Sequence, residues 1–311
     1  MYLKQLTLIL LLLIFNSLSL FSQVNGGTHE KLRELYNLDR FEDCLFKADK
    51  MTQSNKYSRD PEPYLYVAMC FHKISFIDPE ELDNEYSDPL RDALKFALKY
   101  KYKDRNKDFY EQNKEFFSDL KMTTVTRANS SVDVGNYREA SSVLNTLIRV
   151  EEDNPGLELF KGVCDIRNRN RSGNRFIEKA LDSLRIASSD SLYHTNIDDG
   201  TKEALTSGTL LFCNTLEEEN MKDSSKYVIK LVHTILPESE VIEQEYYKIW
   251  GIEKENPKFK NGFEVQYKTT VSDKNQPIPA DSTYKDSLNS TEKVGEMPLQ
   301  DTSENIIEEG L

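Results

Sequence analysis

The sequence predicts an all-α fold, a stack of helical hairpins that share one continuous core. The first observation is a spacing of three, seven and ten residues that recurs along the chain. Glycine, proline or asparagine interrupts each run within two heptads, which argues against a long coiled coil. Sets about 40–50 residues apart therefore indicate an α-solenoid. Four sets place apolar or small side chains on one helical face: Phe41, Cys44, Ala48 and Met51; Leu90, Ala93, Ala97 and Tyr100; Tyr137, Ala140, Leu144 and Leu147; and Ile177, Ala180, Leu184 and Ala187.

We expect the solenoid to cover residues 28–255. Apolar periodicity and turn residues divide it into hairpins and single helices, with Pro89 suited to the first position of a helix. Val241, Ile242, Tyr246, Ile249 and Trp250 are expected to face inward on a terminal helix that caps the stack. The predicted elements are a hairpin over 28–56 with its turn at 37–39, a helix over 64–77, an acidic loop over 78–89, helices over 90–102 and 104–120, hairpins over 122–150, 157–188 and 200–236 with the first two turns at 135–136 and 173–174, and a helix over 239–255.

Residues 1–22 have the pattern of a signal peptide. Lys4 precedes an apolar run over 6–15, and small residues follow up to Ser22. The alternative is an uncleaved anchor, although the apolar segment is short for a bilayer span. No cysteine follows the run until Cys44, so a lipid-anchored N-terminus is not expected. The mature chain is expected in the periplasm, or otherwise outside the cytoplasm, without stable membrane insertion.

The pattern changes after the solenoid. Phe263, Val265 and Tyr267 alternate, which predicts a short β-element or a linker over 256–270. Residues 271–311 read as a disordered acidic tail. The whole chain of 311 residues carries a formal net charge of −13, which argues against generic binding to nucleic acid.

The four cysteines are Cys44, Cys70, Cys164 and Cys213. An exported chain permits disulfides, but Cys44 occupies the position that alanine holds in the other sets, so buried free thiols are favoured. Four histidines, with no metal-ligand spacing and no phosphate-binding loop, give no reason to expect a metal or a cofactor.

The segment from Ala128 through Gly135-Asn136-Tyr137-Arg138-Glu139-Ala140 to Leu147 resembles the tetratricopeptide repeat. The resemblance implies a right-handed superhelix that binds a peptide or a protein on its concave face without catalysis of its own. In that family, polar residues of the first helix line the groove, and Arg127 and Asn129 hold such positions here. The alternative is that both are ordinary solvated helix residues. The tryptophan-glycine signature of the first helix is absent from this chain.

Two basic clusters are the remaining candidates for contacts. Lys99-Tyr100-Lys101-Tyr102-Lys103 mixes cations with aromatic rings, and Arg167, Arg169, Arg171 and Arg175 gather near a predicted turn. Either cluster can be a solvated flank of a helix or a protein contact. We expect a non-catalytic exported scaffold or adaptor that binds protein partners in a cell-envelope complex. The alternative is a peptide- or glycan-recognition module accessory to uptake.

Overall fold

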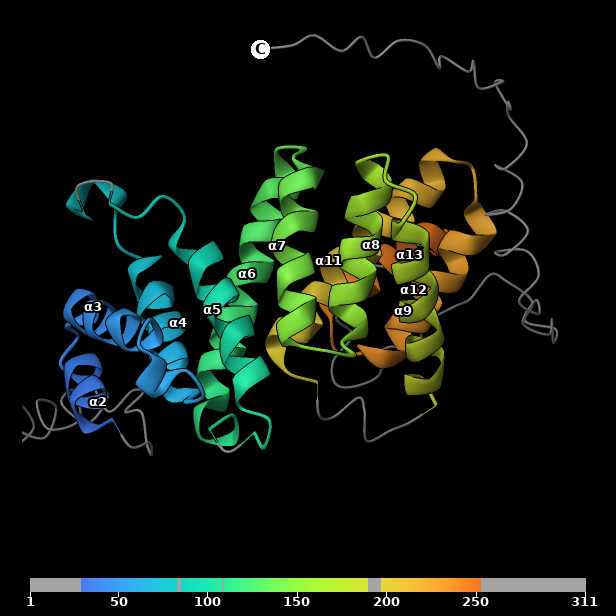
Figure 1. Ribbon diagram of the computed structural model, residues 1–311. Helices are drawn as coiled ribbons and strands as arrows, with labels where there is room; N and C mark the ends of the chain where they lie inside the picture. Colours follow the sequence, from blue (N-terminus) through green and yellow to red (C-terminus); the bar gives the residue numbers. More distant parts are fainter. Residues whose placement is uncertain (1–28, 83–84, 108, 190–196, 253–311) are drawn as a thin grey trace, which may run out of the picture. The chain divides into compact units, whose positions relative to one another are not determined.

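A computed structural model describes residues 29–82, 85–107, 109–189 and 197–252, all within one compact unit, Met1–Asn256 (Figure 1). These residues form helices and connecting turns, and no strand occurs among them. The predicted signal peptide (1–22), β-element or linker (256–270) and acidic tail (271–311) lie outside the described residues.

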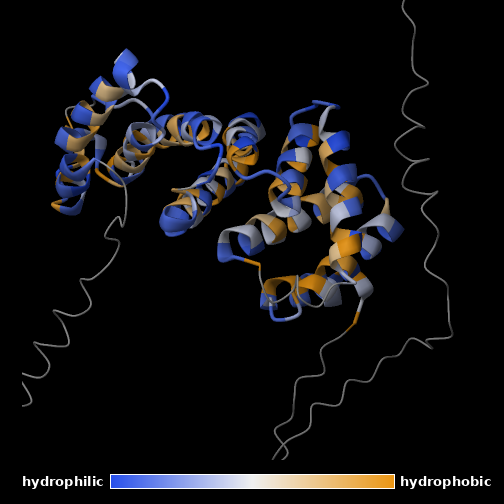
Figure 2. Ribbon diagram, turned by 60° about the horizontal axis from the view of Figure 1, so that its bottom comes forward, coloured by the Kyte–Doolittle hydropathy of each residue, from blue (hydrophilic) through white to orange (hydrophobic). Residues whose placement is uncertain are grey.

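Eleven α-helices make up the described part of the chain. Figure 2 shows that they carry both hydrophobic and hydrophilic residues. Short 3-10 turns, η1 (Asn55–Tyr57), η2 (Pro79–Leu82) and η3 (Glu111–Asn113), lie in three connections. The helices are α2 (Glu30–Asn37), α3 (Phe41–Thr52), α4 (Glu62–Ile74), α5 (Pro89–Lys103), α6 (Lys114–Asp133), α7 (Tyr137–Val150), α8 (Pro155–Arg167), α9 (Gly173–Ala187), α11 (Asp199–Glu218), α12 (Lys222–Ile235) and α13 (Glu240–Trp250).

Several helices begin at a side chain that accepts a hydrogen bond from the first turn. Asp88 accepts from the Arg91 amide at the start of α5, and Asn136 accepts from the Glu139 amide at the start of α7. Such caps satisfy backbone N–H groups that have no partner within the helix. Pro89 is the first residue of α5, as predicted.

Helices that follow one another in sequence pack together, which is the order expected of a helical-repeat stack. Contacts join α2 to α3, α3 to α4, α4 to α5, α6 to α7, α7 to α8, α8 to α9, α11 to α12 and α12 to α13. The repeated spacing marks this core: every residue of the sets on α5 and α9 is buried. The sets on α3 and α7 bury their middle positions, whereas Phe41, Met51 and Tyr137 are half-buried.

Several packing contacts depart from a simple row. The α8 helix packs closely on α11, α5 packs on α7, and α6 packs on α11. The contact between α6 and α11 includes an ion-pair network around the buried Lys121, whose Nζ lies 3.0 Å from both Glu151 Oε2 and Asp198 Oδ2. Burial raises the pKa of Asp198, but hydrogen bonds from Thr201 and Lys121 outweigh it and hold the pKa below its ordinary value.

Two predicted breaks are wrong. Residues 114–133 form the single helix α6, not the end of one helix and the start of another, because no glycine or proline interrupts them. Gly173-Asn174 is not a turn but the first turn of α9, and residues 168–172 make the connection. A Cβ atom at Gly173 would lie 2.3 Å from the Gly162 carbonyl oxygen, so the glycine permits close approach of α8 and α9.

The terminal helix α13 is confirmed, but not all of its predicted inward face. Ile242 is fully buried, whereas Val241 is 50% exposed, and Tyr246, Ile249 and Trp250 are half-buried. The prediction for Val241 is therefore wrong. Val241 and Ile242 are adjacent, and adjacent residues point about 100° apart on a helix.

The four cysteines are free and buried, as favoured above. Burial raises the pKa of the Cys164 and Cys213 thiols to about 12. None of the described helices combines the length and the apolar character that crossing a membrane requires.

Candidate functional site

The two predicted groove residues both lie on α6 and contact neighbouring helices. Arg127 Nη2 lies 3.3 Å from carboxylate oxygens of Asp88 and Glu139. Asn129 Nδ2 donates to Glu203 Oε1 at 2.9 Å. Both side chains thus connect α6 to other elements, and neither lines the clefts described below. Their role in a groove stays a prediction.

A cleft of about 1110 Å³ lies among α3, α4, α5 and the connections beside them. We call it the aromatic–basic cleft. It combines the C-terminal ends of α3 and α5 with the start of α4 and the loop after η1. Its lining residues are Asp49, Thr52, Gln53, Ser58, Arg59, Tyr64, Phe96, Lys99, Tyr102, Lys103 and Arg105.

Two aromatic rings hold two lysines in this cleft. The Tyr64 and Phe96 rings lie 6.5 Å apart, and both residues are largely buried. Lys99 Nζ lies 4.2 Å from the Phe96 ring centroid, and Lys103 Nζ lies 4.5 Å from that of Tyr64. The spacing of residues 96, 99 and 103 puts all three on one face of α5. Attraction between a cation and a ring face fixes the two ammonium groups there.

Backbone contacts fix the cleft further. Tyr64 Oη donates to the Thr52 carbonyl oxygen at 3.2 Å, which ties α4 to the end of α3. Lys103 Nζ donates to the Ser58 carbonyl oxygen at 2.5 Å, which ties the end of α5 to the loop after η1. The cleft is therefore built from side chains that several elements hold in place.

The charge of the cleft is opposite to that of the chain. Its lining contains four cations, Arg59, Lys99, Lys103 and Arg105, and one carboxylate, Asp49. Neither Arg59 nor Arg105 forms an ion pair with any residue that the structure describes. The Asp49 carboxylate accepts hydrogen bonds from Gln53 at 2.6 Å and from Thr52. Cations placed on aromatic rings suit an acidic segment that also carries apolar side chains.

The first basic cluster of the sequence contributes directly to this cleft, but only in part. Lys99, Tyr102 and Lys103 line it. Tyr100 belongs to the core, where its ring stacks on Phe117, and Lys101 turns toward α7 and pairs with Glu152 at 3.0 Å. The mixture of lysine and tyrosine over residues 99–103 is therefore the sequence pattern that indicates this cleft.

The other contributors to the cleft were missed. The sequence predicts a helix that begins at residue 64, but it gives no sign that Tyr64, Phe96 and Arg59 meet in one cleft. These residues come from three different segments, so nothing in their local spacing shows that they meet. Only the packing of α4 on α5 brings the Tyr64 and Phe96 rings together.

The arginines of the second basic cluster, over residues 167–175, likewise have different surroundings. Arg167 pairs with Glu218 and lies 5.4 Å from the Tyr137 ring centroid, so it connects helices. Arg175 lines a smaller polar cleft. Arg169 adopts a φ of 62° in the connection between α8 and α9.

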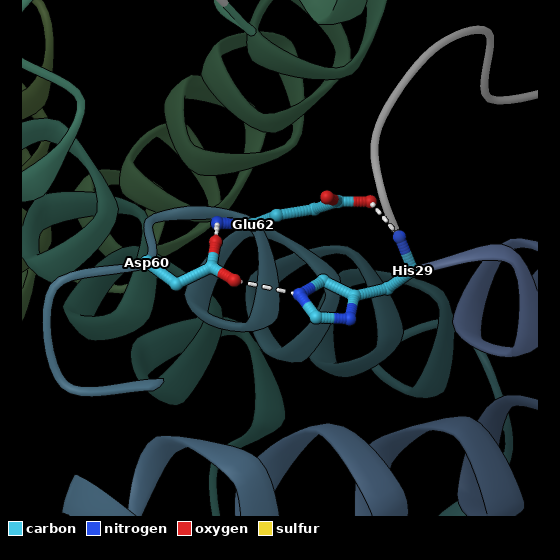
Figure 3. Close-up of side chains that lie close together, drawn as sticks. All are labelled: His29, Asp60 and Glu62. Carbon is cyan, nitrogen blue, oxygen red and sulfur yellow. Dashed lines mark hydrogen bonds and ion pairs between the residues drawn. The ribbon is translucent and has the colours of Figure 1, made fainter. Parts of the chain in front are cut away.

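His29, Asp60 and Glu62 form a cluster with metal-ligand chemistry (Figure 3), the one such group among the described residues. Their ligand atoms lie within 4.8 Å of one another. His29 Nε2 and Asp60 Oδ2 are 2.6 Å apart, and the Glu62 carboxylate accepts from the His29 amide at 3.2 Å. Asp60 Oδ1 also accepts from the Glu62 amide. These hydrogen bonds join the starts of α2 and α4, and this structural role explains why the three side chains lie together.

Comparisons with protein-family models, with curated proteins and with solved structures gave no match. The class of the protein therefore follows from its own architecture. It is an all-helical stack in which neighbours in sequence pack together, compatible with a helical-repeat solenoid, and it carries an aromatic–basic cleft.

Proposed function

We propose that this protein is a non-catalytic, exported scaffold that holds a protein partner of the cell envelope. The aromatic–basic cleft is the observation that carries the proposal. It places four cations and three aromatic side chains around one cavity of about 1110 Å³. The partner contributes an extended acidic segment with interspersed apolar or aromatic side chains.

Three features support this function. The leader pattern of residues 1–22 favours export. The stack of helices offers rigid elements on which a binding surface is held in place. The resemblance of residues 128–147 to the tetratricopeptide repeat favours recognition of a peptide or a protein. The proposal includes a superhelical fold with a right-handed twist.

Photo-crosslinking from inside the cleft tests the proposal. A photoreactive benzoyl side chain replaces Tyr102, which is 59% exposed and lines the cleft. Irradiation of intact cells is expected to give one adduct with an envelope protein. The double variant Lys99→Glu, Arg105→Glu should lose this adduct because it reverses two of the four cationic charges.

A matched control uses the same photoreactive residue at position 186. Ile186 is 74% exposed on α9 and lines neither cleft. We expect no specific adduct from it. The proposal fails if position 102 gives no adduct, if both positions give the same adducts, or if charge reversal leaves the adduct unchanged.

A further inference from the structure

A second cleft lies over α7, α8 and α9, with a volume of about 430 Å³. We call it the polar cleft. It is separate from the aromatic–basic cleft, and the two share no lining residue. Its lining residues are Arg138, Ser141, Ser142, Asn145, Lys161, Asp165, Asn168, Asn170, Ser172, Arg175 and Phe176.

The floor of the polar cleft is a buried charged network. Lys161 Nζ lies 2.5 Å from Asp165 Oδ2, and both side chains are at least nine-tenths buried. Ser141 Oγ donates to Asp165 Oδ1 at 2.5 Å. Lys161 donates to no other oxygen in the described part of the chain, although its ammonium group has three N–H donors.

Phe176 holds two of the cations in position. Lys161 Nζ lies 3.8 Å from its ring centroid, and the Arg175 guanidinium carbon lies 5.3 Å from it. Such contacts are attractive when the cation lies over the ring face. Gly162 and Gly173 permit the close approach of α8 and α9 that brings Phe176 and Lys161 together.

The rim adds two exposed guanidinium groups. Arg138 stands on α7 and Arg175 on α9, and neither forms an ion pair with a residue of the described ranges. The lining therefore contains three cations and one carboxylate, a net charge of +2 in a chain whose net charge is −13. Asn145, Asn168 and the serines supply amide and hydroxyl groups that both donate and accept.

We propose that the polar cleft binds a small phosphorylated sugar. The net charge of +2 complements a phosphate monoester, which carries a charge of about −1.5 to −2 near pH 7. Guanidinium groups match the geometry of phosphate oxygens and can form two parallel hydrogen bonds. The amide and hydroxyl groups of the rim complement sugar hydroxyls. A volume of about 430 Å³ falls at the small end of ligand sites, which span about 300–1,000 Å³.

Isothermal titration calorimetry with the full-length chain at low salt tests this site. Glucose 6-phosphate is the probe, and inorganic phosphate, glucose and malonate are the comparisons. Glucose 6-phosphate is expected to bind at least about tenfold more tightly than any of them, since only it presents a phosphate dianion together with hydroxyls. Equal affinity for malonate would overturn the assignment to phosphate, and equal affinity for inorganic phosphate would overturn the assignment to a sugar.

Two exposed variants place the ligand in this cleft. Arg138→Ala and Arg175→Ala should each weaken binding about tenfold or more, because each removes a charge-assisted hydrogen bond. Arg171→Ala is the matched control, since Arg171 is exposed in the connection between α8 and α9 but does not line the cleft. An unchanged affinity in both cleft variants, an equal loss in the control, or no binding of glucose 6-phosphate at millimolar concentration would overturn the proposal.

Discussion

The buried imidazole of His72 makes the fold sensitive to mild acid. His72 is 2% exposed, its Nε2 lies 3.0 Å from Thr123 Oγ1, and its ring contacts Phe76 and Phe116. Burial lowers the pKa of His72 from 6.5 to about 4. The unfolded chain therefore takes up a proton first as the pH falls. The contribution of neutral His72 to stability is complete above pH 6.5 and is lost between pH 6.5 and 4.

We predict that the unfolding free energy falls by about 2 kcal/mol more between pH 7 and pH 5 in the wild type than in His72→Gln. Glutamine keeps a polar group near Thr123 but does not titrate. Urea unfolding followed by circular dichroism at both pH values measures the difference. The same pH dependence of stability in the two proteins would show that His72 does not cause the loss of stability between pH 7 and pH 5.

The Lys161–Asp165 pair gives a second prediction at the residue scale. Asp165→Ala leaves the buried Lys161 ammonium without its carboxylate, and we expect a loss of about 3–5 kcal/mol. The double variant Lys161→Met, Asp165→Leu should recover most of this loss because it removes both charges. Chemical unfolding of the two variants measures the effect. Equal losses in both would mean that the packing of the site matters more than its charge.

At the element scale, close contacts between helix backbones explain why glycine occupies several helical positions. A Cβ atom at Gly208 of α11 would lie 2.8 Å from the Phe160 backbone nitrogen of α8. Alanine normally stabilises a helix by about 1 kcal/mol relative to glycine. Here the added methyl group meets backbone atoms, and overpacking of a core costs about 1–3 kcal/mol. Gly208→Ala is therefore expected to destabilise the protein despite its better helix propensity.

Gly200→Ala on the same helix is the control for Gly208→Ala. Its new Cβ atom would approach side-chain carbons of Lys121 at 3.0 Å and no backbone atom of another helix, so a smaller shift relieves the contact. Thermal unfolding should rank Gly200→Ala as the more stable of the two variants. The opposite order would contradict the close contact between α8 and α11.

The sequence predicted the helices well where apolar periodicity and strong stop signals coincide. Residues 137–150 show this, because Gly135-Asn136 stops α6 and Asn136 caps α7. The prediction of helix boundaries failed where the same residue type can serve two different structural purposes. Gly173 was assigned to a turn, but its lack of a side chain serves the contact with Gly162.

The candidate site was less accessible to sequence reasoning than the fold. Lys99, Tyr102 and Lys103 were visible as a local cluster, whereas Tyr64 and Arg59 join them only through the packing of α4 and α5. The polar cleft likewise depends on side chains from three helices. A local pattern can indicate that a cation lies near an aromatic residue, but not which distant segment completes the cavity.

At the scale of the whole molecule, export is the first requirement of the proposed scaffold. Cleavage after Ser22 predicts a mature chain that begins at Gln23. N-terminal sequencing of the protein purified from a periplasmic fraction checks this. A cytoplasmic protein that keeps residues 1–22 would contradict the location that the function requires.

The central claim is that the aromatic–basic cleft binds an acidic segment, and peptide affinity tests it most directly. Fluorescence anisotropy would follow a labelled peptide of glutamates interspersed with tyrosines. We predict binding that weakens as salt rises, because charge attraction is screened, and that falls at least about tenfold in Lys99→Glu, Arg105→Glu. Unchanged affinity in that variant, or equal binding of a peptide with lysine in place of glutamate, would contradict the account.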